Sequence, residues 1–351
     1  MKLFEAITKT IKICLKVLIG RIPLKQFLGQ LKYGFYSTYG FPLHWNIYRD
    51  IHLELTSKCN LSCKACYRSG GLKSSMELSS DMDLIGLKKL LQKYDPQKVR
   101  NIILSGGENT LHPQFFEALK ILRSYFPTSS IYLSTNGVYI SRNKELLDKI
   151  CTSSLDFLQF SLHGAKQSTI DLLQKGIDLA KVIDTIVYIK RHSSINICVN
   201  FVIQKENIDE IPLFLELMAK AKVNSVSLTP INYAGHTEKV IDYKTLWKDM
   251  GLKEKLTSAY KIAAKNKISI PPFNPRCTMN ILTMDVITAN GSMLTCCGNY
   301  LPRKYSVGNV FEQDLQQIRK QQSVKLLYNS LKKKKPLKLC VSCWANGLYD
   351  F

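Results

Sequence analysis

The sequence lacks any run of about 18 consecutive apolar residues, so no segment is long and apolar enough to cross a bilayer as a helix. A signal-peptide cleavage pattern, internal repeats and low-complexity linkers are absent as well. Acidic residues are few, with 27 aspartates and glutamates against 49 lysines and arginines and a formal net charge of +22. The basic residues are nevertheless spread over the whole chain, without a nucleic-acid-binding motif, so we expect no nucleic-acid partner.

Cysteine, in contrast, is abundant, with 11 among 351 residues. That number would suggest disulfides in a secreted protein, but no secretion signal accompanies it, and most of the cysteines gather in the spacing of metal ligands. We therefore predict a cytoplasmic protein with metal centres. Cys14, Cys151 and Cys198 stand alone and are interpreted as small buried apolar residues.

The densest group is Cys59, Cys63 and Cys66, which follows an alternating apolar segment, residues 51–56, that predicts a strand. Three thiolates can hold three irons of a [4Fe-4S] cluster and leave the fourth iron open to a small molecule. The alternative is a structural zinc site, for which two Cys-x2-Cys pairs are usual. The first spacing here is three residues, which favours the cluster.

Further short motifs follow predicted strands. Strand 99–104 leads into Ser105-Gly106-Gly107-Glu108, strand 131–133 into Ser134-Thr135-Asn136-Gly137, and strand 157–162 contains Phe160-Ser161-Leu162 and precedes His163-Gly164. Two more strands are expected at 195–204 and 225–230, with helices at 84–94, 115–125, 177–190 and 208–220. Each motif alone is an ordinary turn, but their order and regular spacing are not ordinary.

Together, the Cys-x3-Cys-x2-Cys loop and these motifs resemble the radical S-adenosylmethionine (radical SAM) superfamily. The resemblance implies an α/β fold, a partial (β/α)6 TIM-like barrel with its ligand segments at the carboxyl ends of the strands. It also implies that the open iron binds S-adenosylmethionine (SAM). An electron from a donor such as flavodoxin or ferredoxin then cleaves SAM, giving methionine and a 5'-deoxyadenosyl radical that removes hydrogen from a substrate.

The resemblance assigns roles to individual residues. It places Gly106, Gly107 and Glu108 beside the amino group of SAM, and Ser134, Asn136 and Ser161 among its other contacts. Two positions depart from the family pattern: His163 replaces a common aspartate, and Ala65 replaces an aromatic residue that packs near the adenine. Tyr67 is a candidate substitute for that aromatic residue, and a role in the core is the alternative.

The C-terminal cysteines form a second group. Residues 281–288 and 292–295 flank an Asn-Gly turn, which predicts a hairpin, and a helix is expected at 315–331. The register of Cys277, Gly291 and Cys296 resembles the Cys-x9-15-Gly-x4-Cys opening of SPASM and twitch extensions, which hold auxiliary iron-sulfur clusters. We expect the shorter twitch form with one probable [4Fe-4S] cluster, and zinc is the alternative. The predicted ligands are Cys277, Cys296, Cys340 and Cys343, with Cys297 as the alternative to Cys296.

Four regions result: an N-terminal basic amphipathic helix and lead-in (1–49), the barrel core (50–235), a linking helix (236–270) and the auxiliary cluster domain, a small β-hairpin plus helix (271–351). The apolar positions of residues 1–20 recur at helical spacing among lysines. This helix either docks on the barrel, which we favour, or contacts an anionic membrane surface peripherally.

We therefore expect an enzyme that abstracts hydrogen from a small-molecule or carbohydrate-like substrate. The auxiliary cluster either accepts an electron from a substrate radical, giving a net oxidation, or shapes the substrate site. Maturation of a peptide or protein is the second hypothesis, because related extensions serve both kinds of substrate. A third hypothesis, from another class, is an iron-sulfur electron carrier or zinc-binding protein without SAM chemistry. The motifs around Glu108 and Asn136 argue against it, because a carrier needs no cosubstrate pocket.

Overall fold

The computed structural model describes residues 49–66, 80–233, 239, 241–271, 273, 284–294, 306–332 and 343. All of them belong to one compact unit, Arg49–Phe351. The predicted N-terminal helix and most of the predicted auxiliary cysteines lie outside these ranges. Within the described ranges, no helix is long and apolar enough to span a membrane.

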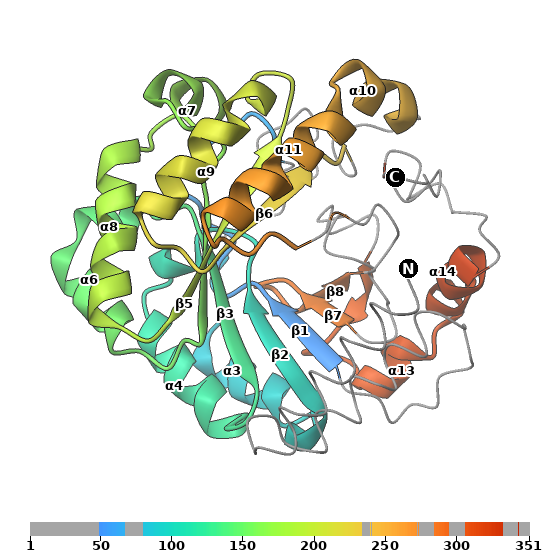
Figure 1. Ribbon diagram of the computed structural model, residues 1–351. Helices are drawn as coiled ribbons and strands as arrows, with labels where there is room; N and C mark the ends of the chain where they lie inside the picture. The colour runs from blue at the N-terminus through green and yellow to red at the C-terminus, as the bar shows by residue number, and fades with distance from the viewer. Residues whose placement is uncertain are drawn as a thin grey trace, which may run out of the picture. The chain divides into compact units, whose positions relative to one another are not determined.

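The strands within the described residues form a single nine-stranded sheet in the order β6-β5-β4-β3-β2-β1-β7-β8-β9 (Figure 1). They are β1 (Arg49–Leu53), β2 (Val99–Leu104), β3 (Ser130–Thr135), β4 (Phe157–Ser161), β5 (Asn196–Ile203), β6 (Ser225–Pro230), β7 (Met284–Ile287), β8 (Ser292–Leu294) and β9 (Ser306–Asn309). Neighbours from β1 to β6 pair in parallel, as a barrel built from strand-helix units requires. The predicted partial barrel is confirmed.

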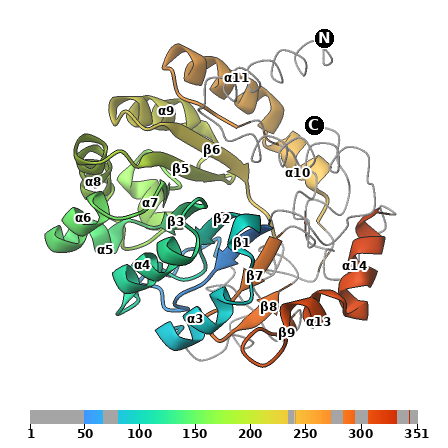
Figure 2. The same cartoon turned by 90° about the horizontal axis from the view of Figure 1, so that it is seen from below.

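Helices connect the parallel strands and cover one face of the sheet (Figure 2). The α-helices are α3 (Leu84–Leu91), α4 (Phe115–Tyr125), α5 (Val138–Arg142), α6 (Lys144–Cys151), α7 (Gln167–Leu173), α8 (Leu179–His192), α9 (Ile211–Lys220), α10 (Tyr243–Asp249), α11 (Leu252–Lys265), α13 (Leu315–Arg319) and α14 (Gln322–Lys332). Short 3-10 helices are η2 (Pro96–Lys98), η3 (Asn109–Leu111) and η4 (Ile208–Glu210). Asp83, Asn143 and Asp178 begin α3, α6 and α8 by accepting backbone hydrogen bonds from the first turn.

Two predicted helices differ from the observed ones. The helix expected at 84–94 ends at Leu91, and Tyr94 leaves it to reach a buried carboxylate. The helix expected at 315–331 is two helices, α13 and α14, with Lys320 as the C-cap residue of α13. Neither Gly nor Pro stands at this break, so nothing local in the sequence marks it.

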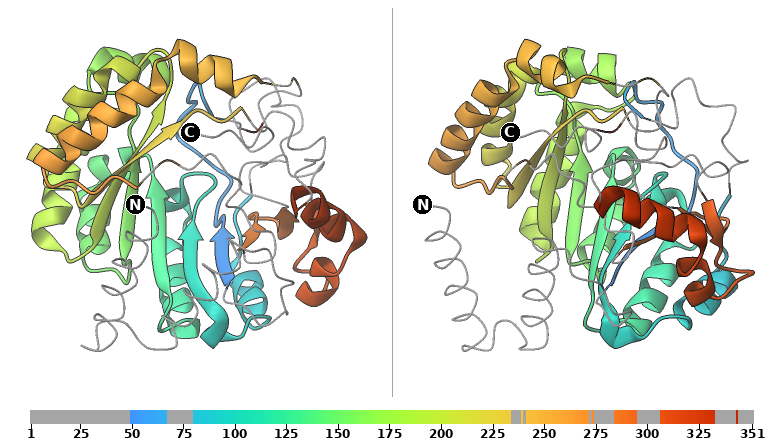
Figure 3. Two further views of the ribbon diagram at one scale, coloured as in Figure 1. Left: turned by 45° about the vertical axis from the view of Figure 1, so that its right-hand side comes forward. Right: turned by 90° about the vertical axis from the view of Figure 1, so that its right-hand side faces the viewer.

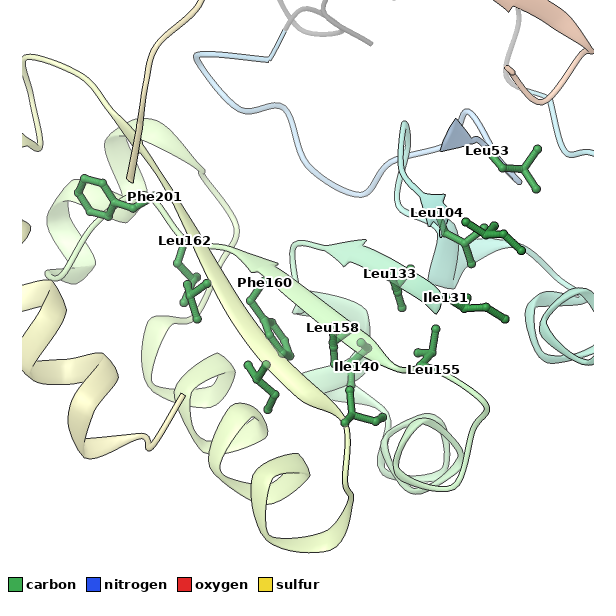
Figure 4. Packing of buried hydrophobic residues seen from close by; sticks show 14 of the residues in the cluster. Leu53, Leu104, Ile131, Leu133, Ile140, Leu155, Leu158, Phe160, Leu162 and Phe201 are labelled. Carbon is green, nitrogen blue, oxygen red and sulfur yellow. The ribbon is translucent and has the colours of Figure 1, made fainter. Parts of the chain in front are cut away.

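Side chains along the central strands alternate between two environments. In β4 and β5, Leu158, Phe160, Val199 and Phe201 are buried against the helices, and Figure 4 shows Leu158, Phe160 and Phe201 within this core. The intervening residues are half-buried and face away from the helices, toward the inside of the barrel. The helix-covered face therefore supplies the core, and the other face is left for ligands.

The C-terminal hairpin extends the barrel sheet. Strand β7 pairs in parallel with β1, and β8 and β9 add antiparallel strands beyond it (Figure 3). The turn between β7 and β8 contains Gly291, whose φ of +83° is the left-handed conformation that an Asn-Gly turn supplies. The hairpin was predicted, but its pairing with β1 and the strand β9 were not.

Candidate active site

The cysteine loop follows β1 directly, and its first residues are hydrogen-bonded to the segment before α3. Thr56 donates a hydrogen bond of 2.5 Å from Oγ1 to Asp81, and the backbone N–H of Ser57 donates to Ser80 at 2.9 Å. The predicted ligands lie at the surface of this loop, with Cys59 exposed and Cys63 and Cys66 half-buried. Strand β1 and the segment before α3 therefore fix the start of the loop that carries the three thiols.

The donor set of this loop fits a polynuclear iron centre. Burial, with smaller contributions from Cys66 and Cys59, raises the pKa of the Cys63 thiol to about 12. Three thiolates brought together repel one another, so a cation must offset their charge before all three can ionise. Iron would supply that charge, and thiolate is the protein ligand that iron-sulfur clusters use.

The Gly106-Gly107-Glu108 segment lies directly against the cysteine loop. The backbone N–H of Glu108 donates to the carbonyl of Lys58 at 2.8 Å. A Cβ on Gly107 would lie 2.3 Å from that carbonyl oxygen and 2.5 Å from the carbonyl oxygen of Thr56. Gly106 has a φ of +123°, and a Cβ there would collide with Glu54. Only glycine allows the two loops to approach this closely.

We expect Gly107→Ala to displace the cysteine loop, because the new methyl group would meet backbone atoms that have little room to move. Overpacking of this kind costs about 1–3 kcal/mol. Iron bound per chain after anaerobic reconstitution is the measurement, and it should fall. Gly86→Ala is the matched control, since its Cβ meets the half-exposed ring of Phe311 at 3.3 Å and alanine suits a helix interior. Equal iron content in both variants would contradict the expectation.

Glu108 is a buried residue whose hydrogen bonds hold two segments of the site together. Its carboxylate is 2% exposed and accepts hydrogen bonds from the hydroxyls of Thr110 (2.6 Å) and Thr135 (2.8 Å) and from the backbone N–H of Asn136 (2.8 Å). Burial raises the pKa of Glu108, and these hydrogen bonds oppose the rise. The residue thus joins the segments after β2 and β3. A direct contact with SAM stays a prediction.

Asn136 joins the segment after β3 to the cysteine loop. Its side-chain amide donates to Asn60 at 2.8 Å and lies 4.0 Å from the sulfur of Cys59, while its Oδ1 accepts from the N–H of Val138 at 2.9 Å. Ser134, two residues earlier, is half-buried on the inner face of β3. The structure therefore brings Asn136 to the cysteine loop, and its predicted contact with SAM stays a prediction.

The end of β4 is linked to the same loop through Gln174, a neighbour of Cys63 that the sequence did not single out. Ser161 is half-buried, and its carbonyl accepts a hydrogen bond from the amide of Gln174. His163 is 8% exposed, and burial lowers its pKa to about 4, so it is neutral at physiological pH. Its Nδ1 accepts from the N–H of Val202, which ties β4 to β5. His163 therefore has a structural role at this position.

The inner faces of β4, β5 and β6 carry mostly hydroxyl, thiol and amide groups. The inward positions are Phe157, Gln159, Ser161, Cys198, Asn200, Val202, Ser225, Ser227 and Thr229. Ser227 and Thr229 are 3.2 Å apart, and Thr229 is 3.5 Å from Asn200. Contrary to the prediction of an apolar role, Cys198 belongs to this polar wall, where Gln159 of β4 and Ser225 of β6 are its partners in the strand register. None of these positions carries lysine or arginine.

Cys343 is the only predicted auxiliary ligand within the described ranges; Cys277, Cys296, Cys297, Cys340 and the proposed adenine contact Tyr67 lie outside them. Asn232, which follows β6, donates a hydrogen bond of 3.5 Å to the sulfur of Cys343. One C-terminal cysteine is therefore located at the carboxyl end of β6. Cys151, in contrast, packs against the core, as expected for an isolated cysteine.

Comparison with known families agrees with this geometry. Residues 53–218 match the radical SAM superfamily, and residues 277–344 match SPASM, an iron-sulfur cluster-binding domain. The first of these domains binds a [4Fe-4S] cluster and SAM, and the second indicates auxiliary iron-sulfur clusters.

Curated relatives include a "Probable GTP 3',8-cyclase" of Saccharolobus islandicus, 26% identical over 252 residues that cover 71% of this chain and 77% of the relative. Another of the same description, from Sulfurisphaera tokodaii, is 26% identical over 254 residues, covering 71% and 75%.

Solved structures of similar fold include Streptococcus suis SuiB bound to its precursor peptide SuiA (15% identity, TM-score 0.64, 93% of this chain and 76% of that one). Another is anSMEcpe with bound AdoMet (16% identity, TM-score 0.63, 84% of this chain and 85% of that one). At these identities the similarity shows the fold alone.

Proposed function

Because the chain is a radical SAM protein with a SPASM domain, we propose that it is an enzyme that removes hydrogen from a neutral, polar small molecule of carbohydrate-like character. Cys59, Cys63 and Cys66 would hold the [4Fe-4S] cluster, which supplies the one-electron cleavage of SAM when bound. The support for these ligands is that the loop carrying them is hydrogen-bonded to the segments that end β2 and β3, through Lys58 and Asn60.

The remaining residues of the site would bind and orient the cosubstrate. Gly106 and Gly107 let their segment pack directly against the cysteine loop, so that their backbone would lie beside the amino group of SAM. Ser134 and Asn136 would offer polar groups at the end of β3, and Glu108 would hold both segments in register. Tyr67 is the proposed adenine contact.

The polar wall of β4–β6 carries the proposal about substrate. Its hydroxyl and amide groups can exchange hydrogen bonds with hydroxyl groups of a substrate, whereas none of its positions supplies a cation for a triphosphate. Relatives described as probable GTP 3',8-cyclases make a nucleotide the natural competing candidate. The uncharged wall favours a neutral substrate instead.

We propose Cys277, Cys296, Cys340 and Cys343 as ligands of an auxiliary [4Fe-4S] cluster, with Cys297 as the alternative to Cys296. The contact of Asn232 with Cys343 at the end of β6 supports a location near the barrel mouth. There the cluster could accept an electron from a substrate radical. A flavodoxin- or ferredoxin-type donor would reduce the N-terminal cluster.

The test is hydrogen transfer from defined probes. Anaerobically reconstituted protein, SAM and dithionite are incubated with deuterated neutral sugars and cyclitols, with deuterated GTP, or with deuterated short peptides. We expect deuterium in 5'-deoxyadenosine from the sugar or cyclitol group alone. Transfer from GTP or from a peptide would overturn the substrate proposal, and the absence of any 5'-deoxyadenosine would overturn the enzyme proposal.

Asn200→Leu should weaken productive binding of such a substrate, because the amide at the centre of the polar wall becomes an apolar side chain of similar size. Loss of one neutral hydrogen bond is worth about 0.5–1.5 kcal/mol, or roughly 2- to 13-fold in deuterium transfer. Uncoupled cleavage of SAM should not change. Asn196→Leu is the control, since Asn196 is exposed at the start of the same strand. Equal transfer by both variants would contradict the role of this wall.

A further inference from the structure

The segment Leu173–Gly176, which begins at the last residue of α7, lies against the middle of the cysteine loop. The backbone N–H of Lys64 donates to the carbonyl of Leu173 at 2.9 Å. Gly176 has a φ of +106°, and a Cβ there would lie 3.1 Å from a methyl carbon of Leu61. The loop is therefore supported from the α7 side as well as by Gly107. On the α7 side the two contacts fall at Leu61 and Lys64, which flank Cys63 along the chain.

Gln174 occupies the centre of this segment with its side chain almost fully enclosed, at 1% exposure. Its Oε1 accepts a hydrogen bond of 2.6 Å from the N–H of His163, and its Nε2 donates one of 3.0 Å to the carbonyl of Ser161. Cys63 is a further polar neighbour of this side chain, and the interaction lowers the pKa of its thiol against the rise that burial causes. An amide nitrogen has two protons, so one serves Ser161 and the other is available for the sulfur.

We propose that Gln174 is a positioning residue that donates a hydrogen bond to the sulfur of Cys63 and thereby strengthens the binding of the N-terminal cluster and favours its reduction. A donor to a ligand sulfur stabilises negative charge there, and the reduced cluster carries one more negative charge than the oxidised one. The same amide links the sulfur to the end of β4, so the cysteine loop and the barrel mouth keep their relative position. This inference rests on the proposed assignment of Cys63 as a cluster ligand.

The test compares Gln174→Leu with the unchanged protein, both reconstituted anaerobically. Loss of a hydrogen-bond partner of a metal ligand typically costs about 10- to 100-fold in metal affinity. We accordingly expect chelator-driven loss of iron from the N-terminal cluster to become at least about 10-fold faster. At a fixed, buffered potential, we also expect a smaller reduced fraction of the paramagnetic resonance signal that responds to added SAM. This signal reports the cluster with the open iron, and neither readout requires substrate turnover.

Two further variants are measured beside Gln174→Leu. Gln167→Leu is the matched control, because Gln167 is an amide of the same helix that bonds to Asp171, Ile177 and Leu179 and not to the cysteine loop. Gln174→Glu keeps the size and the acceptor for His163 but removes both donors, so it carries the test if the leucine variant fails to fold. Its iron loss should be at least as fast.

The outcomes separate this inference from the proposed function. Iron loss and reduction of Gln174→Glu that match the unchanged protein would overturn the role of Gln174, while the cluster and its SAM response would still stand. If the unchanged protein shows no SAM-responsive signal at all, the proposed function fails with it.

Discussion

Cys63→Ala is expected to abolish formation of 5'-deoxyadenosine, and Cys59→Ala and Cys66→Ala should have the same effect. Loss of a residue that only supports a metal ligand costs up to about 100-fold, so loss of a ligand should exceed that figure. The measurement is 5'-deoxyadenosine released from SAM by anaerobically reconstituted protein with dithionite, which needs no knowledge of the substrate. Iron content should fall in parallel, because two thiolates hold a cube poorly.

Cys343→Ala distinguishes the role of the auxiliary cluster from that of the N-terminal cluster. It should lower the iron content from about eight to about four per chain, since each cluster holds four irons. Cleavage of SAM should persist at least in part. Cys151→Ser is the control for general effects, because Cys151 lies on α6 against the core and outside both groups. Full cleavage by Cys63→Ala, or complete loss with Cys151→Ser, would contradict the assignment of the N-terminal ligands.

The sequence predicted the barrel because its signals are local. The parallel strands are short segments in which buried apolar residues mostly alternate with polar ones, and a turn rich in glycine or polar residues follows several of them. The Gly-Gly pair at 106–107 could be noticed for the same reason. Its physical purpose, a close approach to the carbonyls of Thr56 and Lys58, became visible only in three dimensions.

Contacts between distant segments were not predictable in this way. The pairing of β7 with β1 joins residues more than 230 positions apart, and no local pattern encodes which edge of a sheet a hairpin will extend. Gln174 is another example. An amide at the end of a short helix gives no signal of its own, and its importance follows from three partners in two other segments. Alternation along β5 placed Cys198 on the inner face, but a single cysteine was interpreted as apolar.

A buried charge cluster holds β1 and β7 together at the base of this extension. The carboxylate of Asp285 in β7 is fully buried and accepts hydrogen bonds from Arg49 at 3.1 Å, from the hydroxyl of Tyr94 at 2.8 Å, and from Arg319. Burial alone would raise the pKa of Asp285, but the two guanidinium groups more than offset it, so the pKa lies below its ordinary value of 3.8. The carboxylate is therefore charged at neutral pH, and it is shared by the first barrel strand, the segment after α3 and α13.

Asp285→Asn should destabilise the folded protein by about 3–5 kcal/mol, because it leaves Arg49 and Arg319 buried without a compensating charge. Since the folded-state pKa of Asp285 is depressed, its contribution is complete above the unfolded-state pKa and is lost as the pH falls through the folded-state value. The difference between variant and unchanged protein should therefore be constant from about pH 5 to 8 and shrink only below about pH 4.

Urea unfolding of the iron-loaded proteins, followed by circular dichroism, measures this difference. Asp148→Asn is the control, because Asp148 pairs with Lys144 on the surface of α6, where solvent screens the charges. The variant Arg49→Met/Asp285→Leu/Arg319→Met should recover much of the stability, since apolar side chains of similar size need no partner charge. If the urea concentration at the unfolding midpoint were the same for Asp285→Asn and the unchanged protein, water would have to reach both arginines in the folded variant. The hairpin would then be held to β1 by backbone pairing and apolar contacts alone.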